Sequence, residues 1–473
     1  MEQLHSIVNA VNGVLWGNVM TYMLLGVGLL YTLILKFPQV RGFGHMFKVV
    51  FGGRRKATSE GISSFQALCT SLAAQVGTGN IAGVATAVAA GGPGAVFWMW
   101  MTALIGMATI HAEAILGQVY RVRDEKGELR GGPAYYIERG LGWRWLGVLF
   151  SISIIFAMPF VFNSVQSNSI VSGVTGAWPT LSPSLLGLIL VVITAVVIFG
   201  GLKRIAHVAE LIVPLMAALY LLLALFVVAK NITLMPYVFR TVFEGAFKGI
   251  NPVAGGVLGY TVAQAFRYGV ARGLFSNEAG MGSTPNANAV ADVRHPGRQA
   301  YAAMMGVFMD TIVICTCTAL IVLLAYDPAT ELTGVQLTQF ALSREIGTWG
   351  AKFVAIALIF FAWTSILGNY YYGETNIRNL NNGRTTLFVF RLIVLGFIYF
   401  GAVNKVQLIW DMADMFNGIM AFINLFALIL LVAVVYKVSA DYDRRRRMGE
   451  EDPYLDREAI EYSFANVRLP KHR

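Results

Sequence analysis

Long apolar stretches alternate with short polar ones along the whole chain, and this pattern predicts a bundle of membrane-spanning helices. A helix needs about 20 mostly apolar residues to cross the hydrocarbon core of a bilayer. We expect eleven such spans, at 17–36, 64–91, 94–120, 145–171, 184–200, 207–229, 256–290, 299–326, 349–372, 385–405 and 411–437. Backbone polar groups inside a bilayer must be bonded internally, so these spans are expected to be α-helices and not an open sheet.

The composition excludes most other classes of protein. Hydrophobic residues make up 56% of the 473 residues and charged residues only 13%, whereas soluble domains carry about 25% charged residues. Disorder and collagen do not fit this composition. The only cysteines are Cys69, Cys315 and Cys317, all in apolar stretches, so we expect reduced packing residues and not a disulfide scaffold. The chain is therefore expected to be an all-α polytopic membrane protein in a lipid bilayer.

The basic residues predict the orientation of the bundle, because they accumulate on the cytoplasmic side of membrane proteins. If eleven spans are correct, most of the basic residues fall on one side. They are Lys36, Arg41, Lys48, Arg54, Arg55, Lys56, Arg121, Arg123, Lys126, Arg130, Arg139, Arg144, Lys203, Arg204, Arg294, Arg298, Arg378, Arg384 and Arg444–Arg447. The N-terminus is then outside and the C-terminus cytoplasmic. This bias explains the net charge of +10, so we expect no nucleic-acid partner.

Three segments outside the spans carry expectations of their own. Segment 37–63 mixes apolar and basic residues, which indicates an amphipathic helix at the membrane interface. The tail from Ser439 to Arg473 is polar and is expected to be a solvated appendage, with Arg444–Arg447 facing anionic lipid. Residues Met1–Asn12 lack the basic start of a cleavable signal peptide.

The second and seventh spans are expected to be broken in the middle. The second contains Gly77-Thr78-Gly79-Asn80, and the seventh contains Asn277 followed by Gly280 and Gly282. Each glycine in a helix interior costs about 1 kcal/mol relative to alanine. Unwound backbone inside a membrane is tolerated only where it is buried in protein or lines a wet cavity, and its bare amides and carbonyls can hold a carboxylate and a cation. The alternative is that these small residues only allow close helix packing.

Two broken helices five spans apart favour a secondary transporter with an inverted repeat. This divides the chain into an extra N-terminal helix with a basic loop (1–63), a first repeat (64–230), a second repeat (231–437) and a charged tail (438–473). The extra helix precedes two units of five spans, so the discontinuous helices are the second and the seventh.

Four strings of residues carry a resemblance to a known family. They are Gly77-Thr78-Gly79-Asn80-Ile81-Ala82-Gly83, Gly91-Gly92-Pro93-Gly94-Ala95, Gly131-Gly132-Pro133-Ala134-Tyr135-Tyr136 and Phe275-Ser276-Asn277-Glu278-Ala279-Gly280-Met281-Gly282-Ser283. Together they closely resemble the alanine/glycine:cation symporter family of prokaryotes, over essentially the whole chain. The resemblance implies a leucine-transporter-like 5+5 inverted repeat in the cell (inner) membrane. It also implies uptake of small neutral amino acids coupled to sodium or protons, without any other cofactor.

The same resemblance implies a substrate site at the two breaks. The amides of Gly77, Thr78 and Gly79, with Asn80 beside them, would receive the substrate carboxylate. Phe275, Ser276 and Asn277 would contact the amino group or close over the side chain. Ser71 and Gln75 lie one helical turn apart, so they can share the pocket face.

The resemblance further implies a sodium site between the second and ninth spans. Thr364 and Ser365 match adjacent hydroxyls of the superfamily's shared sodium site, and the carbonyls of Ala73, Val76 and Phe361 would complete the oxygen shell. The alternative is that Thr364 and Ser365 only bond the carbonyls four residues earlier in their own helix.

Ionisable residues at membrane depth are further candidates for function. Glu278 lies inside a family motif and is expected to pair with Arg267 or Arg272, with a proton site as the alternative. Asp310 is expected to bond neighbouring helices, or else to serve a second cation site. Glu113 is expected to reach toward the cytoplasmic surface.

Other classes of function fit less well. The six histidines form no metal-spaced pair, and neither an enzyme motif nor a nucleotide-binding loop is present. An enzyme or a nucleotide-driven pump is therefore not expected. A channel or a proton-coupled carrier of another small solute remains an alternative to the sodium symporter. The choice among alanine, glycine and serine, the enantiomer, the stoichiometry and the oligomeric state are left open.

Overall fold

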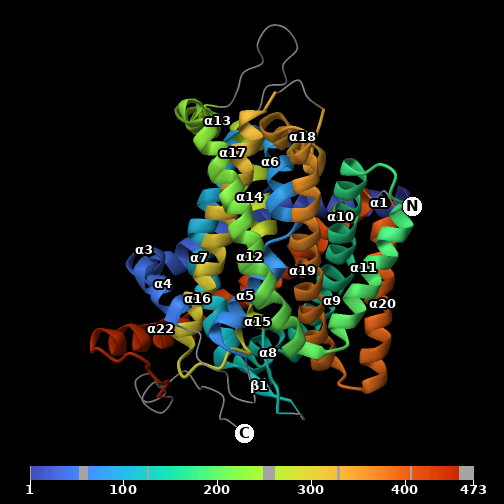
Figure 1. The fold of residues 1–473 in the computed structure, drawn as a ribbon. Helices are drawn as coiled ribbons and strands as arrows, with labels where there is room; N and C mark the ends of the chain where they lie inside the picture. The colour runs from blue at the N-terminus through green and yellow to red at the C-terminus, as the bar shows by residue number, and fades with distance from the viewer. Residues whose placement is uncertain are drawn as a thin grey trace.

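The structure, a computed structural model, describes residues 2–52, 62–124, 127–248, 261–327, 331–404 and 407–456. These residues form a tall bundle of helices, with both broken spans inside it (Figure 1). Residues 53–61 of the expected interfacial segment, residues 256–260 of the seventh span, residue 405 and the tail from 457 lie outside the described residues.

The first half of the chain holds the first broken span. Its helices and strands are α1 (Glu2–Val14), η1 (Leu15–Val19), α2 (Met20–Ile34), α3 (Pro38–Arg41), α4 (Phe43–Gly52), α5 (Ser64–Gln75), η2 (Gly79–Gly83), α6 (Val84–Gly91), α7 (Gly94–Val119), β1 (Val122–Arg123), β2 (Leu129–Arg130), α8 (Pro133–Tyr136), η3 (Ile137–Leu141), α9 (Arg144–Ile155), η4 (Phe156–Phe162), α10 (Asn163–Ala177), α11 (Pro183–Ile198) and α12 (Gly201–Lys230). The two strands form a small antiparallel hairpin in which Val122 faces Arg130.

The second half holds the second broken span. Its elements are η5 (Ile232–Leu234), α13 (Met235–Phe247), α14 (Val262–Asn277), α15 (Pro285–Asn288), α16 (Pro296–Val307), η6 (Phe308–Cys315), α17 (Thr316–Leu324), α18 (Gly334–Ile346), α19 (Trp349–Leu380), α20 (Arg384–Val403), α21 (Gln407–Leu430) and α22 (Val432–Arg447). α14 packs against α7, and α19 packs against both α5 and α10.

The observed helices follow the expected spans closely. Each of the eleven expected stretches contains helix, within the described residues. In the part of the chain that the structure describes, seven helices are long and apolar enough to cross a membrane, and the bent pair Ser64–Gln75 and Gly79–Gly91 brings this number to eight. Two shorter apolar helices, Met20–Ile34 and Pro183–Ile198, match the first and fifth spans. The total of eleven spans therefore stays a prediction, as does the division of the chain at 63, 230 and 437.

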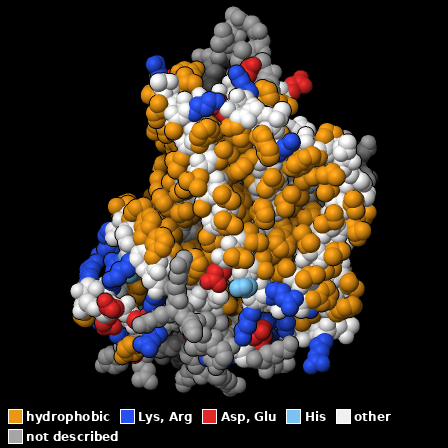
Figure 2. Space-filling view, viewed as in Figure 1, with side chains coloured by type: hydrophobic (Ala, Val, Ile, Leu, Met, Phe, Trp, Pro, Cys, Tyr) orange, Lys and Arg blue, Asp and Glu red, His pale blue; other side chains and the backbone are white. Residues whose placement is uncertain are grey.

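The surface has an apolar belt and one strongly basic end. On α11 and α12, Val196, Leu211 and Leu222 are each more than 60% exposed, a pattern that fits lipid and not water. On the face drawn in Figure 2, apolar side chains cover the middle of the bundle, and many basic side chains lie near the end that carries α22. We call that end the basic face; it holds α3, α4, the β1–β2 hairpin and α22. The opposite face holds α13 and α18 (Figure 1).

The expectation for the tail was wrong for the residues up to Arg447. The eleventh span ends at Leu430, and a separate helix, α22, follows and packs on α7 and α16. Val438, Asp441 and Tyr442 are buried there. Asp441 accepts hydrogen bonds from Arg444 at 2.6 Å and from Arg445 at 3.1 Å. Polar composition suggested a solvated segment, but one apolar face of α22 is enough to dock it.

Three histidines, His45, His111 and His295, form hydrogen bonds with α22. Burial lowers the pKa of His45 and of His295, the two that lie outside the expected spans. His295 Nε2 lies 3.3 Å from Asp441 Oδ2, and His45 Nε2 lies 3.0 Å from the Tyr442 hydroxyl. Burial, helped by the cations Arg446, Lys48 and Arg298 and opposed by Asp443, lowers the pKa of His45 to about 4. Burial also lowers the pKa of His295, although Asp441 and Glu450 oppose this and Arg445 adds to it.

We therefore expect acid to loosen α22. Both folded-state pKa values lie below the ordinary value of 6.5. Below pH 6.5 His45 and His295 take up protons more readily when α22 is undocked than when it is docked. Docking therefore weakens as the pH falls from about 6.5 toward 4. The pKa of Asp441 is lowered to about 2, so Asp441 stays ionised throughout this window. Hydrogen exchange of residues 432–447 should rise over the window. The rise should be smaller in His45→Gln and unchanged in the control His5→Gln on α1; an exchange rate independent of pH in the native protein contradicts this account.

Candidate substrate and cation site

Both expected breaks are present, and each has a clear local cause. α5 ends at Gln75, and the helix axis turns by 51° before the chain continues as η2 and α6. α14 ends at Asn277, after which Glu278, Gly280 and Gly282 adopt positive φ angles of 57°, 92° and 82°. Glycine adopts such angles without a steric penalty, so the two glycines allow the chain to leave the helix.

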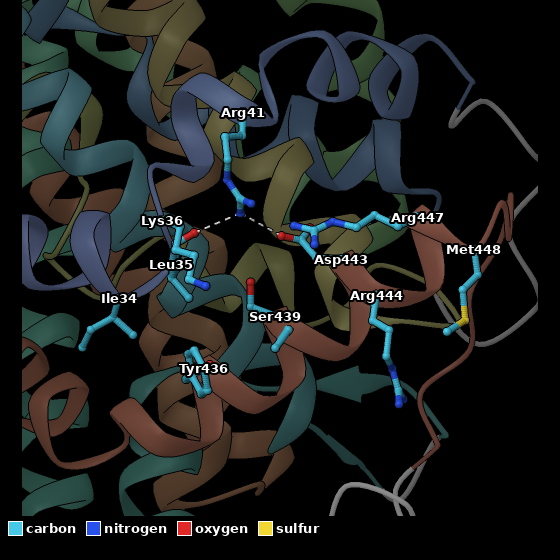
Figure 3. Close-up of a pocket in the computed structure, with 11 residues that line it drawn as sticks. Ile34, Leu35, Lys36, Arg41, Tyr436, Ser439, Asp443, Arg444, Arg447 and Met448 are labelled. Atoms are coloured by element: carbon cyan, nitrogen blue, oxygen red, sulfur yellow. Dashed lines mark hydrogen bonds and ion pairs between the residues drawn. The ribbon is translucent and has the colours of Figure 1, made fainter.

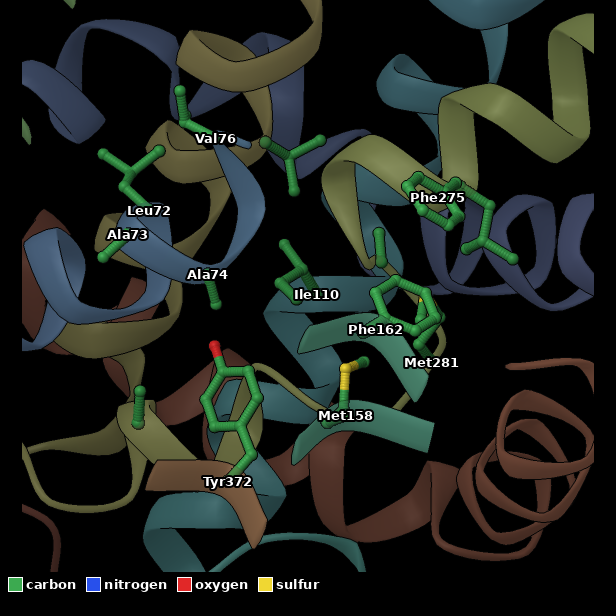
Figure 4. Packing of buried hydrophobic residues seen from close by; sticks show 14 of the residues in the cluster. Leu72, Ala73, Ala74, Val76, Ile110, Met158, Phe162, Phe275, Met281 and Tyr372 are labelled. Carbon is green, nitrogen blue, oxygen red and sulfur yellow. The ribbon is translucent and has the colours of Figure 1, made fainter. Parts of the chain in front are cut away.

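The two breaks lie against each other in the middle of the bundle. A Cβ atom on Gly79 would lie 3.1 Å from the Phe275 ring and 3.2 Å from Ser276 Cα. Gln75 Nε2 donates to the Asn277 carbonyl at 2.8 Å. Figure 4 shows Val76 and Phe275 on facing segments, with apolar side chains such as Met158 and Phe162 around them. Segments about 200 residues apart in the chain thus form one site.

The amides of the first break already have partners. Gln166 Oε1, on α10, accepts from the Thr78 amide at 3.0 Å and from the Thr78 hydroxyl at 2.7 Å. Asn80 Oδ1 accepts from the Gly77 amide at 2.8 Å. The expectation of bare amides at Gly77 and Thr78 is therefore corrected. In this conformation two side-chain amide oxygens accept from donors that the resemblance assigns to the substrate carboxylate.

A buried carboxylate joins the two breaks. Asp310, on η6, accepts from Asn80 Nδ2 at 2.6 Å and from the Ser276 hydroxyl at 2.8 Å. The neighbouring hydroxyl of Thr311 also donates to it at 2.7 Å. Asp310 thus bonds neighbouring helices, as expected, and it links residues from both breaks.

The other two buried carboxylates differ from the expectations. Glu278 accepts from the Ser283 hydroxyl at 2.6 Å, whereas Arg272 pairs with Asp414 at 3.1 Å. The expected clamp between Glu278 and Arg272 is therefore wrong, and among the described residues Arg267 forms no ion pair with Glu278 either. Pairing was expected because a buried charge normally needs an opposite charge, but hydroxyl donors from the same broken segment satisfy this carboxylate.

Glu113 is fully buried and does not extend toward the surface. Its carboxylate accepts from the amides of Gly280 and Gly282, at 3.1 and 3.0 Å, and from Asn424 Nδ2 at 2.5 Å. The second break therefore does hold a carboxylate with its bare amides, but the carboxylate belongs to the protein. This contact could not be predicted from the sequence, because Glu113 lies on a long apolar span and Gly280 is 167 residues away in the chain.

Four of the five expected cation ligands lie close together where α5 ends beside α19. The Ser365 hydroxyl donates to the Val76 carbonyl at 3.3 Å and to the Phe361 carbonyl at 3.1 Å. The Thr364 hydroxyl donates to the Phe361 carbonyl at 2.9 Å. These four groups form a set of neutral oxygens that suits a hard cation. Gly77 also lies against this set, because a Cβ atom there would lie 2.3 Å from Ser365 Oγ.

Ala73 and Ser71 are less closely tied to the site. Ala73 is buried in the last turn of α5, three residues before Val76, which follows the end of that helix. The Ser71 hydroxyl donates to the Leu68 carbonyl of its own helix at 3.0 Å. Gln75 faces the second break, and its Oε1 atom is buried without a hydrogen-bond partner among the described residues.

A cavity of about 460 Å³ lies near the opposite face, and Trp410 on its wall stacks on Phe275 at the second break. Phe275 stacks on Phe162 at 4.7 Å and on Trp410 at 5.7 Å between ring centroids. Arg272 lies over both Phe275 and Trp410 and makes a two-point ion pair with Asp414, at 3.1 and 3.3 Å. Arg272, Trp410 and Asp414 all line the cavity. Trp410 and the ion pair therefore form part of the wall of this cavity, which we call the vestibule.

Gln166 is the main residue that the sequence reasoning missed. It lies in α10 among Asn163, Ser164 and Ser167, a polar cluster inside an otherwise apolar span. Polar residues clustered at membrane depth often mark a functional site, and this cluster was the signal that could have identified Gln166. It lies on the face of α10 that meets the first break.

The chain is similar to known transporters over nearly its full length. The profile of the sodium:alanine symporter family matches residues 1–457. The probable sodium/glutamine symporter GlnT of Bacillus subtilis is 46% identical over 97% of this chain and 95% of its own. The sodium/alanine symporter AgcS of Methanococcus maripaludis is 43% identical over 93% of this chain and 98% of its own.

The fold is that of a solved transporter as well. The crystal structure of MhsT in complex with L-phenylalanine superposes with a TM-score of 0.58 at 14% identity, over 81% of this chain and 93% of that one. This supports the leucine-transporter-like fold. The broken helices, the fold and the match of residues 1–457 lead to one conclusion: this chain is a membrane transporter of the sodium:alanine symporter family.

Proposed function

We propose that the protein imports a small neutral amino acid, alanine or glycine, together with sodium. The observation that carries the proposal is that the Ser365 hydroxyl oxygen on α19 lies 3.3 Å from the Val76 carbonyl oxygen at the first break. The two segments thus meet through oxygen atoms, which are the ligands that a hard cation prefers. The same break also carries the Gly77 and Thr78 amides, which Asn80 and Gln166 satisfy in this conformation. An ion and a zwitterion can therefore be held by adjacent atoms of one segment.

In this proposal the substrate carboxylate replaces protein side chains at the first break. Gln166 Oε1 leaves the Thr78 amide and hydroxyl, and Asn80 Oδ1 leaves the Gly77 amide, so the carboxylate takes these donors together with the Gly79 amide. The amino group then meets acceptors near Asp310, Ser276 and the Asn277 carbonyl. Phe275 closes over the side chain, and apolar neighbours favour a small, uncharged one. The family description supports alanine, and the name of GlnT makes glutamine the larger substrate to compare.

The coupling follows from the shared segment. Sodium held by Val76, Phe361, Thr364 and Ser365, with Ala73 nearby, fixes the break of α5 against α19. This stabilises the arrangement in which the amides are presented to the substrate, so each ligand favours the conformation that binds the other. The basic face is cytoplasmic by the distribution of Lys and Arg. The vestibule therefore opens outward, with the N-terminus outside and the C-terminus inside the cell.

The ion pair of Arg272 with Asp414 is expected to act as the outer closure. The Asp414→Asn substitution removes the ion pair that holds Arg272 over the Phe275 and Trp410 rings. We expect substrate exchange across the outer face to persist while net uptake falls about tenfold to hundredfold, because a charge-assisted hydrogen bond contributes about 1.5–3 kcal/mol. Asp411→Asn is the matched control in the same cavity. Equal loss of exchange and net uptake contradicts a closure role.

The direct test of the proposed function is uptake of radiolabelled alanine by proteoliposomes. Sodium and proton gradients are imposed separately, with glycine, serine and glutamine as competitors. Accumulation above equilibrium with a sodium gradient alone is the expected result, and a channel cannot produce it. Uptake that only equilibrates, or that ignores sodium, overturns the proposal.

A proton-coupled carrier is the second candidate, and one observation favours it. Glu113, Glu278 and Asp310 are all buried, and none has a basic partner within ion-pair distance among the described residues. A buried carboxyl group that is held only by neutral donors can take up a proton without breaking an ion pair. Uptake driven by a pH gradient without sodium would select this candidate.

A further inference from the structure

A second cavity lies on the basic face, far along the bundle from the two breaks. It has a volume of about 400 Å³ and lies between the end of α2 and the tail helix α22. The side chains that line it are Ile34, Leu35, Lys36, Arg41, Tyr436, Ser439, Ala440, Asp443, Arg444, Arg447 and Met448. Figure 3 shows the charged side chains around this cavity, with Lys36 beside Leu35 at the end of α2 and with Asp443, Arg444 and Arg447 on α22.

The charged part of the cavity is suited to an anion. Four basic side chains and one carboxylate line it. The carboxylate, Asp443, pairs with Arg41 at 3.0 Å and accepts from Tyr301 at 3.1 Å. Arg444 bonds Asp441 but stays 59% exposed. Within the described part of the chain Lys36 and Arg447 form no ion pair, so two cations are left to meet a ligand.

The backbone places Lys36 at this cavity by an uncommon turn. Lys36 and Phe37 have φ angles of 56° and 57°, a region that residues with a side chain seldom adopt. The Phe37 amide donates to the Thr32 carbonyl at 2.7 Å, and Pro38 starts α3 directly afterwards. This reversal at the end of α2 places Lys36 on the cavity and leaves the Phe37 side chain exposed.

The apolar part of the cavity indicates that the anion carries hydrocarbon. Ile34, Leu35 and Tyr436 line the cavity. Leu33, on α2 next to Ile34, is 55% exposed. Free phosphate needs none of this surface, whereas a lipid places its phosphodiester among the cations and its acyl chains along the apolar side chains.

We propose that this cavity is a binding site for an anionic phospholipid of the inner leaflet. The phosphodiester is held by Lys36 and Arg447, with Arg41 and Arg444 beside it, and the acyl chains follow Leu33, Ile34 and Tyr436. The bound lipid links α2 to α22 and so helps to dock the tail helix. This site is separate from the transport site and does not depend on the proposed substrate or ion.

The test is native mass spectrometry of the full-length protein titrated with phosphatidylglycerol or phosphatidylcholine. The native protein should bind phosphatidylglycerol more tightly than phosphatidylcholine. The double variant Lys36→Gln, Arg447→Gln should lose about thirtyfold in phosphatidylglycerol affinity, since each basic residue contributes about 1 kcal/mol at an anionic surface. Its affinity for phosphatidylcholine should not change. The control Arg139→Gln, Arg144→Gln removes two exposed arginines of the basic face outside this cavity and should match the native protein.

Two further measurements separate the possible sources of the anion and locate it. Millimolar inorganic phosphate should leave phosphatidylglycerol binding unchanged, and a photoreactive phosphatidylglycerol should label residues 432–448. The proposal is overturned if phosphate displaces the lipid, if the native protein does not prefer phosphatidylglycerol, or if the double variant binds it as tightly as the native protein. If the double variant fails to fold, the proposal is still tested by whether the native protein binds phosphatidylglycerol more tightly than phosphatidylcholine.

Discussion

Replacing Thr364 and Ser365 together by alanine is expected to raise the sodium concentration needed for half-maximal uptake by about tenfold to thirtyfold. Both hydroxyls lie at the Phe361 carbonyl, and Ser365 also reaches the Val76 carbonyl. Their loss removes two oxygen ligands from the proposed shell. If each is valued at about 1 kcal/mol, as for a typical hydrogen bond, the two together give this change. Alanine uptake as a function of sodium concentration measures it.

The control for this prediction is Thr175→Ala. The Thr175 hydroxyl bonds the carbonyl four residues earlier, Val171, at 2.8 Å, as Ser365 does with Phe361, but it lies on α10 away from Val76. Loss of such a local bond alone should leave the sodium dependence unchanged. If the double variant keeps the native sodium dependence, the hydroxyls only satisfy their own helix and the cation site lies elsewhere.

The sequence predicted the fold well, because the signals for it are local. Apolar length marks the spans, and closely spaced glycines mark the breaks of the second and seventh. The tail was misjudged because the docking of α22 depends on a few buried positions, such as Val438 and Tyr442. Average polarity does not reveal such positions, and their partners lie in distant parts of the chain.

The site was predicted only in part, for a related reason. The residues placed there by motif, such as Val76, Asn80 and Ser276, do lie around the two breaks. Their partners could not be found from spacing. Gln166 and Asp310 reach the site from other helices, 88 and 230 residues from their partners Thr78 and Asn80. Backbone amides freed by a break are satisfied by whichever acceptor the tertiary fold brings near, and the local sequence does not name it.

The second prediction with a large effect concerns Glu113, whose carboxylate satisfies three donors of the second break. Glu113→Ala leaves the amides of Gly280 and Gly282 and the Asn424 side chain without this acceptor in a buried region. An unsatisfied buried donor costs about 1–3 kcal/mol, so the three donors together predict a loss of about 3–9 kcal/mol of stability. Thermal unfolding of the purified protein in detergent, and its yield in the membrane, should both fall sharply.

Glu113→Gln separates this structural role from a role of the negative charge. Glutamine keeps one acceptor oxygen at the same reach, so it should recover a large part of the stability that alanine loses. If Glu113→Gln folds and accumulates alanine with the native sodium dependence, the charge of Glu113 takes no part in transport and its oxygen atoms serve the second break alone. If Glu113→Ala is as stable as Glu113→Gln, the amides of Gly280 and Gly282 find other partners and the carboxylate does not hold the break together.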